Sequence, residues 1–122
     1  MLAMLSMMAL ITSCGSPIAS DKALSVANQV VQVTEDYLDG NKDGDNAYEQ
    51  IQKLYHDLDY VDDYTYDDKK DDAQKDADYN IQLKISYLQT SMLIDSVSST
   101  PDTFDKLQAD LDKLKESIKE YD

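Results

Sequence analysis

The sequence predicts an all-α protein, a small antiparallel bundle of four helices, or of three if one segment frays. Apolar residues recur every three or four positions in four separate segments, which is the spacing of one helix face. Breaks rich in Asp, Asn, Gly, Ser and Pro separate these segments, and neither strand alternation nor a useful internal repeat is seen. Because the breaks are short, consecutive helices are expected to lie antiparallel.

The first helix is expected over residues 21–38. Ser20 is a suitable N-cap, since its hydroxyl can accept a hydrogen bond from a free backbone amide. Gly40 suits the left-handed position that closes a helix. Two neighbouring apolar stripes predict a wide buried face. They are Leu24, Ala27, Val31 and Leu38, and Val26, Val30, Val33 and Tyr37.

The second helix is expected from Asn46, as its N-cap, to about Val61. Glu49 lies three residues after Asn46 and would complete a capping box. Aspartates crowd the last turns, where negative charge opposes the helix dipole, so this end is expected to fray. The apolar stripe comprises Ala47, Tyr48, Ile51, Leu54, Tyr55, Leu58 and Val61.

The third helix is expected from a cap within residues 65–68 to about Val97. Its main stripe comprises Ala73, Ala77, Ile81, Ile85, Leu88 and Met92. A second apolar face predicts that this helix has neighbours on both sides. That face comprises Leu83, Tyr87 and Ile94.

The fourth helix is expected to begin at Pro101, a favoured first helical residue, with Thr100 as its N-cap. Its apolar residues alternate at spacings of three and four, which is a heptad seam. They are Phe104, Leu107, Leu111, Leu114, Ile118 and Tyr121. We interpret this seam as bundle core, with a self-associating coiled coil as the alternative.

The net charge of the chain limits the classes of partner that it can bind. Its 25 acidic residues face 11 lysines, which gives a formal net charge of −14. Nucleic acid is excluded as a partner, because phosphate contacts need clustered Lys and Arg. A domain lying flat on anionic lipid is disfavoured for the same reason. The charge fits a well-solvated surface, or one that meets cations or a basic partner.

An uncharged apolar run, residues 2–11, precedes Cys14, the only cysteine of the chain. With Ile11-Thr12-Ser13-Cys14 it resembles the signal and lipobox of bacterial lipoproteins. The resemblance implies that the Cys14 thiol takes a diacylglyceryl group and that the signal is cut before it. It also implies that the new amine is often acylated. The usual Lys or Arg before the apolar run is missing here.

On this resemblance, residues 1–13 are a signal peptide, 14–20 a lipidated tether and 21–122 an acidic helical bundle domain. The protein is then expected in the cell envelope, lipid-anchored on the extracytoplasmic side of a bacterial membrane, with the loop at residues 39–46 and the turn at residues 96–102 together in its distal tip. Two alternatives stay open. Residues 1–11 could form a buried helix end with Cys14 as a core thiol, or a transmembrane helix, although the run falls short of the ~20 residues a span needs.

The run DGNKDG at residues 39–44 matches the first half of an EF-hand calcium loop between two helices. The last position of such a loop, normally a bidentate Glu, is Gln50 here, and no second loop follows. Weak calcium binding and a plain Asp/Asn/Gly turn are therefore the two interpretations. The implied ligands are the side chains of Asp39, Asn41 and Asp43 and the carbonyl of Asp45.

No pattern in the sequence indicates an enzyme. His56 is the only histidine, without a second ligand at zinc spacing, and no serine has a credible base. The expected function is a non-enzymatic interaction domain, without cofactor unless calcium binds, whose partner is a basic protein or peptide. The alternative is a calcium-dependent binding module that uses the EF-hand-like loop at residues 39–50. Tyrosines are expected partly in the core with a wet hydroxyl and partly exposed among aspartates. The first group is Tyr48, Tyr55 and Tyr87, and the second is Tyr60, Tyr64 and Tyr66.

Overall fold

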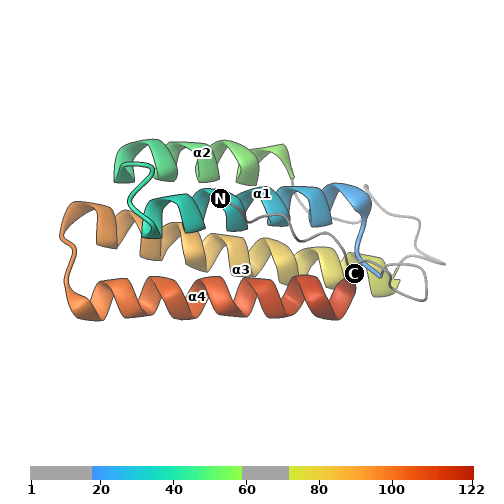
Figure 1. The fold of residues 1–122 in the computed structure, drawn as a ribbon. Coiled ribbons are helices and arrows are strands. Elements are labelled where there is room, and N and C mark those ends of the chain that lie inside the picture. The colour runs from blue at the N-terminus through green and yellow to red at the C-terminus, as the bar shows by residue number, and fades with distance from the viewer. Residues whose placement is uncertain (1–17, 59–71) are drawn as a thin grey trace.

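The computed structural model describes residues 18–58 and 72–122. These residues form four α-helices and no strand, packed as an antiparallel bundle (Figure 1). The predicted fold class is thereby confirmed. The helices are α1 (Asp21–Leu38), α2 (Gly44–Asp57), α3 (Asp72–Val97) and α4 (Pro101–Tyr121).

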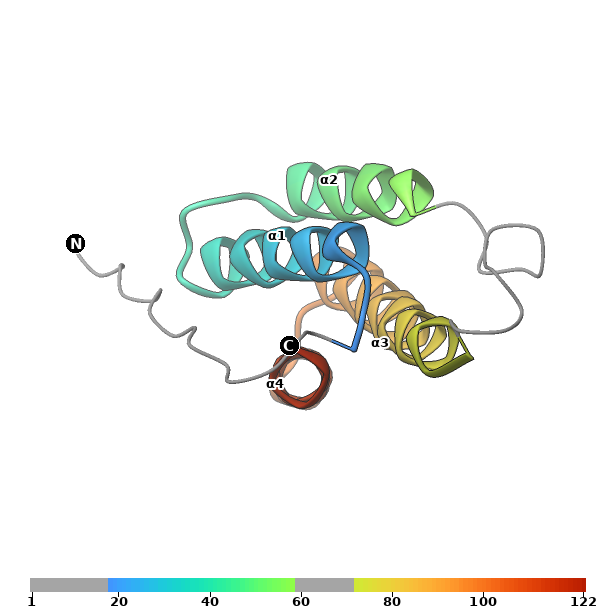
Figure 2. The ribbon, with the colours of Figure 1, turned by 90° about the vertical axis from the view of Figure 1, so that its right-hand side faces the viewer.

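The longest helix, α3, packs against all three of the others (Figure 2). Helix α1 also contacts α2 and α4, whereas α2 and α4 lie diagonally opposite in the described part of the chain. α2, with 14 residues, is much shorter than α3, with 26. One side of α3 is therefore covered by α2 and another by α4, while its outer side faces away from the bundle.

The core is built from the apolar stripes that the helical spacing predicts. All four helices contribute fully buried aliphatic side chains, so the bundle has a single continuous core. The largest of these are Val30 of α1, Ile51 of α2, Ile81, Ile85, Leu88 and Met92 of α3, and Leu107, Leu111 and Leu114 of α4.

Three helix ends follow their predicted caps. The Ser20 hydroxyl accepts a hydrogen bond from the Ala23 amide at the start of α1. Gly40, with a φ of 82°, closes α1 in the left-handed conformation. At the start of α4, the Thr100 hydroxyl accepts from the Thr103 amide, and the Thr103 hydroxyl accepts from the Thr100 amide. This reciprocal pair is a capping box with threonine in both positions.

The predicted start of α2 at Asn46 is wrong. Asp43 is the N-cap, and its Oδ1 accepts from the Asn46 amide at 2.9 Å. Asp43 and Asn46 are equally good capping residues, so local preference alone could not separate them. The earlier start lets Gly44 lie against Ser96 of α3. The helix also ends at Asp57, before the predicted Val61, which lies outside the described residues.

Four apolar side chains that were predicted to lie in or beside the core are exposed. Ala73 lies in the first turn of α3 as described and is exposed. Phe104, the first residue of the heptad seam, is 39% exposed. Tyr87 and Ile94 are each about half exposed, because neither α2 nor α4 reaches the outer side of α3.

The two ends of the bundle differ. At one end the α1–α2 loop lies beside the last turn of α3, because Gly44 contacts Ser96 there. At the other end the amide of Ile18 donates to the carbonyl of Tyr121 at 2.9 Å. Figure 1 shows this end on the right, beside the C-terminus. The expected placement of residues 39–46 and 96–102 at one common end is therefore correct.

Candidate functional site

The outer side of α3 carries an uncharged surface in a strongly acidic chain. Between positions 79 and 97 of α3, no exposed residue is Asp, Glu, Lys or Arg. Val97 is 77% exposed and Ile94 51%. Large contiguous patches of exposed apolar side chains mark binding surfaces, and apolar side chains gathered on one helix can form such a patch. We call this surface the α3 face, and its members are Tyr79, Tyr87, Thr90, Leu93, Ile94 and Val97.

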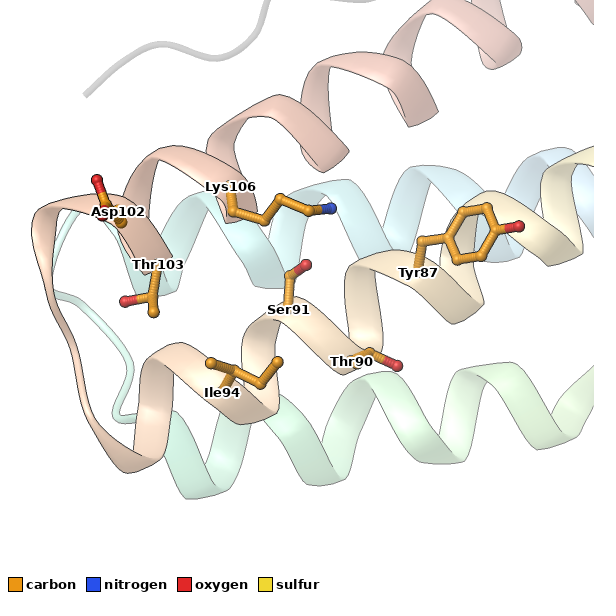
Figure 3. A pocket seen from close by; sticks show the side chains of 7 residues that line it. All are labelled: Tyr87, Thr90, Ser91, Ile94, Asp102, Thr103 and Lys106. Carbon is orange, nitrogen blue, oxygen red and sulfur yellow. The ribbon is translucent and has the colours of Figure 1, made fainter.

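A groove runs along the α4 side of the α3 face, and its volume is about 360 Å³ (Figure 3). Tyr87 stands at one end of the groove and Ile94 toward the other, while Lys106 reaches over Ser91 from α4. This volume lies near the lower limit of small-ligand pockets and suits one or two large side chains of a partner. The lining residues are Tyr87, Thr90, Ser91 and Ile94 of α3 and Asp102, Thr103 and Lys106 of α4.

The charge of Lys106 in the groove is already paired. Its Nζ lies 3.0 Å from both carboxylate oxygens of Asp110, which is almost completely buried. The Ser91 hydroxyl donates to the same carboxylate from α3. Asp110 therefore joins α3 to α4 beneath the groove, and Lys106 offers little free positive charge to a ligand.

A second buried carboxylate, Asp95, lies close to this groove. Three hydroxyls donate to it: that of Tyr37 from α1 at 2.5 Å, that of Thr103 from α4 at 2.6 Å and that of Ser99 at 3.1 Å. Burial alone would raise the pKa of Asp95, but the three hydrogen bonds to its ionised form outweigh burial and lower the pKa. Burial, and then the hydrogen bond and charge of Asp95, raise the pKa of Tyr37 to about 12.

The third buried aspartate, Asp78, accepts from the amide of Ser20 at 2.8 Å and ties α3 to the start of α1. Sequence reasoning missed all three buried carboxylates. The signal was present, because Asp95 stands three residues after Met92 on the main stripe of α3. Likewise, Asp110 stands three residues after Leu107 on the seam of α4. We assign these aspartates a structural role, since their partners belong to the protein.

The residues of the predicted calcium loop line two different hollows, with Asp39 at one and Asp43 and Asp45 at the other. As the N-cap of α2, Asp43 accepts from the backbone amide of Asn46 through Oδ1, and its Oδ2 accepts from the side-chain amide of Asn46. Asp45 lies in the first turn of α2, where its carbonyl belongs to the helical hydrogen-bond pattern. Asp39 and Asn41 are exposed. Within the described residues, no group of three or more His, Cys, Asp or Glu could hold a metal ion.

Gly44 has a packing role in this structure. A Cβ built on Gly44 would lie 2.4 Å from the Cβ of Ser96, so only glycine fits between α2 and α3. Its backbone is helical, and the left-handed glycine of this loop is Gly40. The glycine at the sixth position of the calcium-loop pattern therefore has a second explanation, because Gly44 allows the start of α2 to pack closely against α3.

A shallow acidic hollow lies on the α2 side of the α3 face, at the last turns of α3. Three carboxylate residues line it together with Ser96, the neighbour of Val97. All three side chains are exposed. The α3 face is therefore bordered by negative charge where it is most apolar. We call this the acidic hollow, and its carboxylates are Asp43, Asp45 and Glu49.

The proposed lipidation residue, Cys14, lies outside the described residues, as do Tyr60, Tyr64 and Tyr66. His56 is exposed, with its ring against the edge of Tyr55. Tyr48 and Tyr55 are partly buried against the core, as predicted. No helix in the described part of the chain is both long and apolar enough to cross a membrane.

Comparison of the chain with family models, with curated proteins and with solved structures finds no match.

Proposed function

We propose that this chain is a membrane-tethered lipoprotein whose helical domain binds a basic protein or peptide outside the cytoplasm and performs no catalysis. The single observation that carries the binding proposal is the α3 face. It presents exposed apolar side chains, led by Val97 and Ile94, in a chain with a formal net charge of −14. Keeping such side chains in water has a free-energy cost that a binding partner would remove.

The tethering proposal rests on the lipobox of the sequence and fits the geometry of the bundle. Cys14 precedes Ile18 by four residues, which span at most roughly 14 Å when extended. Ile18 lies at the end of the bundle that holds Tyr121, and Val97 ends α3 at the opposite end. A lipid on Cys14 would therefore leave the apolar end of the α3 face pointing away from the membrane.

Two measurements on intact cells test this function. Replacing Cys14 by Ser should abolish labelling with palmitate and leave an unprocessed precursor. A variant that labels and fractionates like the parent would contradict the lipid anchor.

For binding, a photo-cross-linking amino acid at position 94 should capture a protein or peptide on the cell envelope. The same amino acid at position 104, which is exposed on α4, is the matched control. Equal adducts at the two positions, or none at either, would contradict binding through the α3 face.

A further inference from the structure

We propose that the α3 face binds a cationic amphipathic helix, whose apolar stripe lies along α3 and whose basic residues meet the acidic hollow. This inference rests on the proposed function and adds the chemistry and secondary structure of the partner. It draws on three separate features: the shape of the surface, the apolar side chains on it and the charges beside it.

The shape of the surface favours a helix. The described residues form helices only, so they offer no sheet edge to which a partner strand could add. The groove between α3 and α4 runs between two packed helices, which is where the side chains of a third helix fit. The stretch from Tyr79 to Val97 is about 27 Å long at helical rise, so a partner helix of about 18 residues would match it.

The apolar side chains provide two neighbouring contact areas. Leu93, Ile94 and Val97 cover the last two turns of α3, and each is more than 40% exposed. Beside them, the groove between Tyr87 and Ile94 can take one or two large side chains of the partner. A helix with apolar residues three and four positions apart would fill both areas from one side.

The flanking charges select a basic partner. The acidic hollow, with Asp45 and Glu49, lies on the α2 side of α3. On the α4 side Asp102 lines the groove, where Lys106 is neutralised by Asp110. Lysines or arginines beside the apolar stripe of a partner would meet negative charge on both flanks. A second copy of this chain would instead bring equal charges together at the same edges, which opposes dimerisation through the α3 face.

The test titrates the full chain, in neutral detergent, with a fluorescent 18-residue helical peptide that has leucines on one stripe and lysines beside it. The matched probe keeps the leucines and replaces every lysine by glutamate. We expect saturable binding of the lysine peptide, weakened by salt, and none of the glutamate peptide. Equal binding of both peptides, or of neither, would overturn the proposal.

Protein variants separate a specific site from diffuse attraction. Replacing Ile94 and Val97 by Ser should weaken binding at least about tenfold. Replacing Phe104 by Ser, another exposed apolar side chain, should change it less than about twofold. Thermal melting of each variant checks folding, which exposed positions should leave intact. Equal losses of peptide binding in the two variants would show that the peptide does not bind at the α3 face, and the proposal would be wrong.

Charge variants make the same comparison for the acidic hollow. Asp45→Asn with Glu49→Gln should weaken peptide binding several-fold. Asp112→Asn with Glu116→Gln removes the same charge from exposed positions of α4 and should have a much smaller effect. Equal effects would show that the peptide follows net charge alone, and the proposal would be wrong.

The outcomes also distinguish this inference from the proposed function. Cross-linking at position 94 in cells, without binding of the lysine peptide, would reject the cationic helix and leave the binding function standing. Sedimentation as a dimer that Ile94→Ser dissociates would identify a second copy as the occupant and overturn the inference. Failure of both cross-linking and peptide binding would reject the two proposals together.

Discussion

The hydroxyl of Tyr37 donates a 2.5 Å hydrogen bond to the Oδ2 of Asp95 and joins the last turn of α1 to α3. Thr103 donates to the other carboxylate oxygen of Asp95 from α4. One buried carboxylate therefore connects three helices at the end of the bundle where the apolar part of the α3 face lies. A buried aspartate that kept no partner would destabilise the protein strongly, so this arrangement fixes how the helices align.

Asp95→Asn should reduce the loss of stability in acid. The pKa of Asp95 is lowered in the folded protein, so its ionised form adds stability above the ordinary carboxyl pKa. That stability disappears as the pH falls below about 4 and through the lowered pKa. Thermal melting from pH 7 to pH 2 should therefore fall less steeply for Asp95→Asn than for the parent. Asp112→Asn, a control at an exposed position, should show the same pH dependence of melting as the parent. Identical slopes for the parent and both variants would refute the lowered pKa of Asp95.

Tyr37→Phe should destabilise the domain by about 1.5–3 kcal/mol, the usual contribution of a hydrogen bond to a charged group. The pKa of Tyr37 is raised to about 12, so the stability linked to its neutral hydroxyl is complete below about pH 10. It is lost as the pH rises through about 12. Denaturant unfolding at pH 7 and pH 11 measures both effects. A Phe variant as stable as the parent at pH 7 would contradict the role of this hydrogen bond.

Gly44→Ala should destabilise the domain by about 1–3 kcal/mol, because the added Cβ overlaps the Cβ of Ser96 in a packed interface. Alanine is otherwise the better helix former, so without the overlap the change would stabilise α2. The double variant with Ser96→Gly removes one of the overlapping atoms and should recover part of the loss. Denaturant unfolding of both single variants and the double variant gives this coupling. A stabilising Gly44→Ala would show that α2 and α3 lie farther apart.

The fold was predictable because its decisive signals are local. The 3.6-residue period, the Ser20 cap and the Thr100-Pro101 start each involve neighbours in sequence, and the structure confirms all three. The start of α2 was not predictable from local signals, because the choice between Asp43 and Asn46 as N-cap depends on the contact between Gly44 and Ser96.

The α3 face was harder to predict for a related reason. Spacing placed Tyr87 and Ile94 on a second apolar face of the third helix, and the structure has that face. Periodicity says that a face is apolar, but it does not say whether the same chain covers it. The length of α2 and the side of α3 on which α4 packs decided that question. The buried Asp95 and Asp110 were missed because apolar spacing does not show whether a charged residue that stands on a stripe is buried or solvated.

The α1–α2 loop and the first two turns of α2, residues 39–50, should bind calcium only weakly. Gln50 offers one neutral oxygen where a calcium loop has a bidentate glutamate. Both oxygens of Asp43 are already hydrogen-bonded, since Oδ1 caps α2 and Oδ2 accepts from the side-chain amide of Asn46. Coordination by the carbonyl of Asp45 would require the first turn of α2 to open. We therefore expect affinity at the weak end of the range, ~10⁻⁴–10⁻³ M.

Binding of that strength adds ~0.4–1.4 kcal/mol when calcium is between one and ten times the dissociation constant. Calorimetry should show little heat at micromolar calcium, and melting should rise by only a few degrees at millimolar calcium. Asp39→Ala is the informative variant, because its exposed side chain caps nothing, whereas Asp43→Ala would destabilise α2 without any metal. Micromolar affinity that Asp39→Ala abolishes would contradict this prediction. It would also mean that metal rearranges the acidic hollow beside the α3 face.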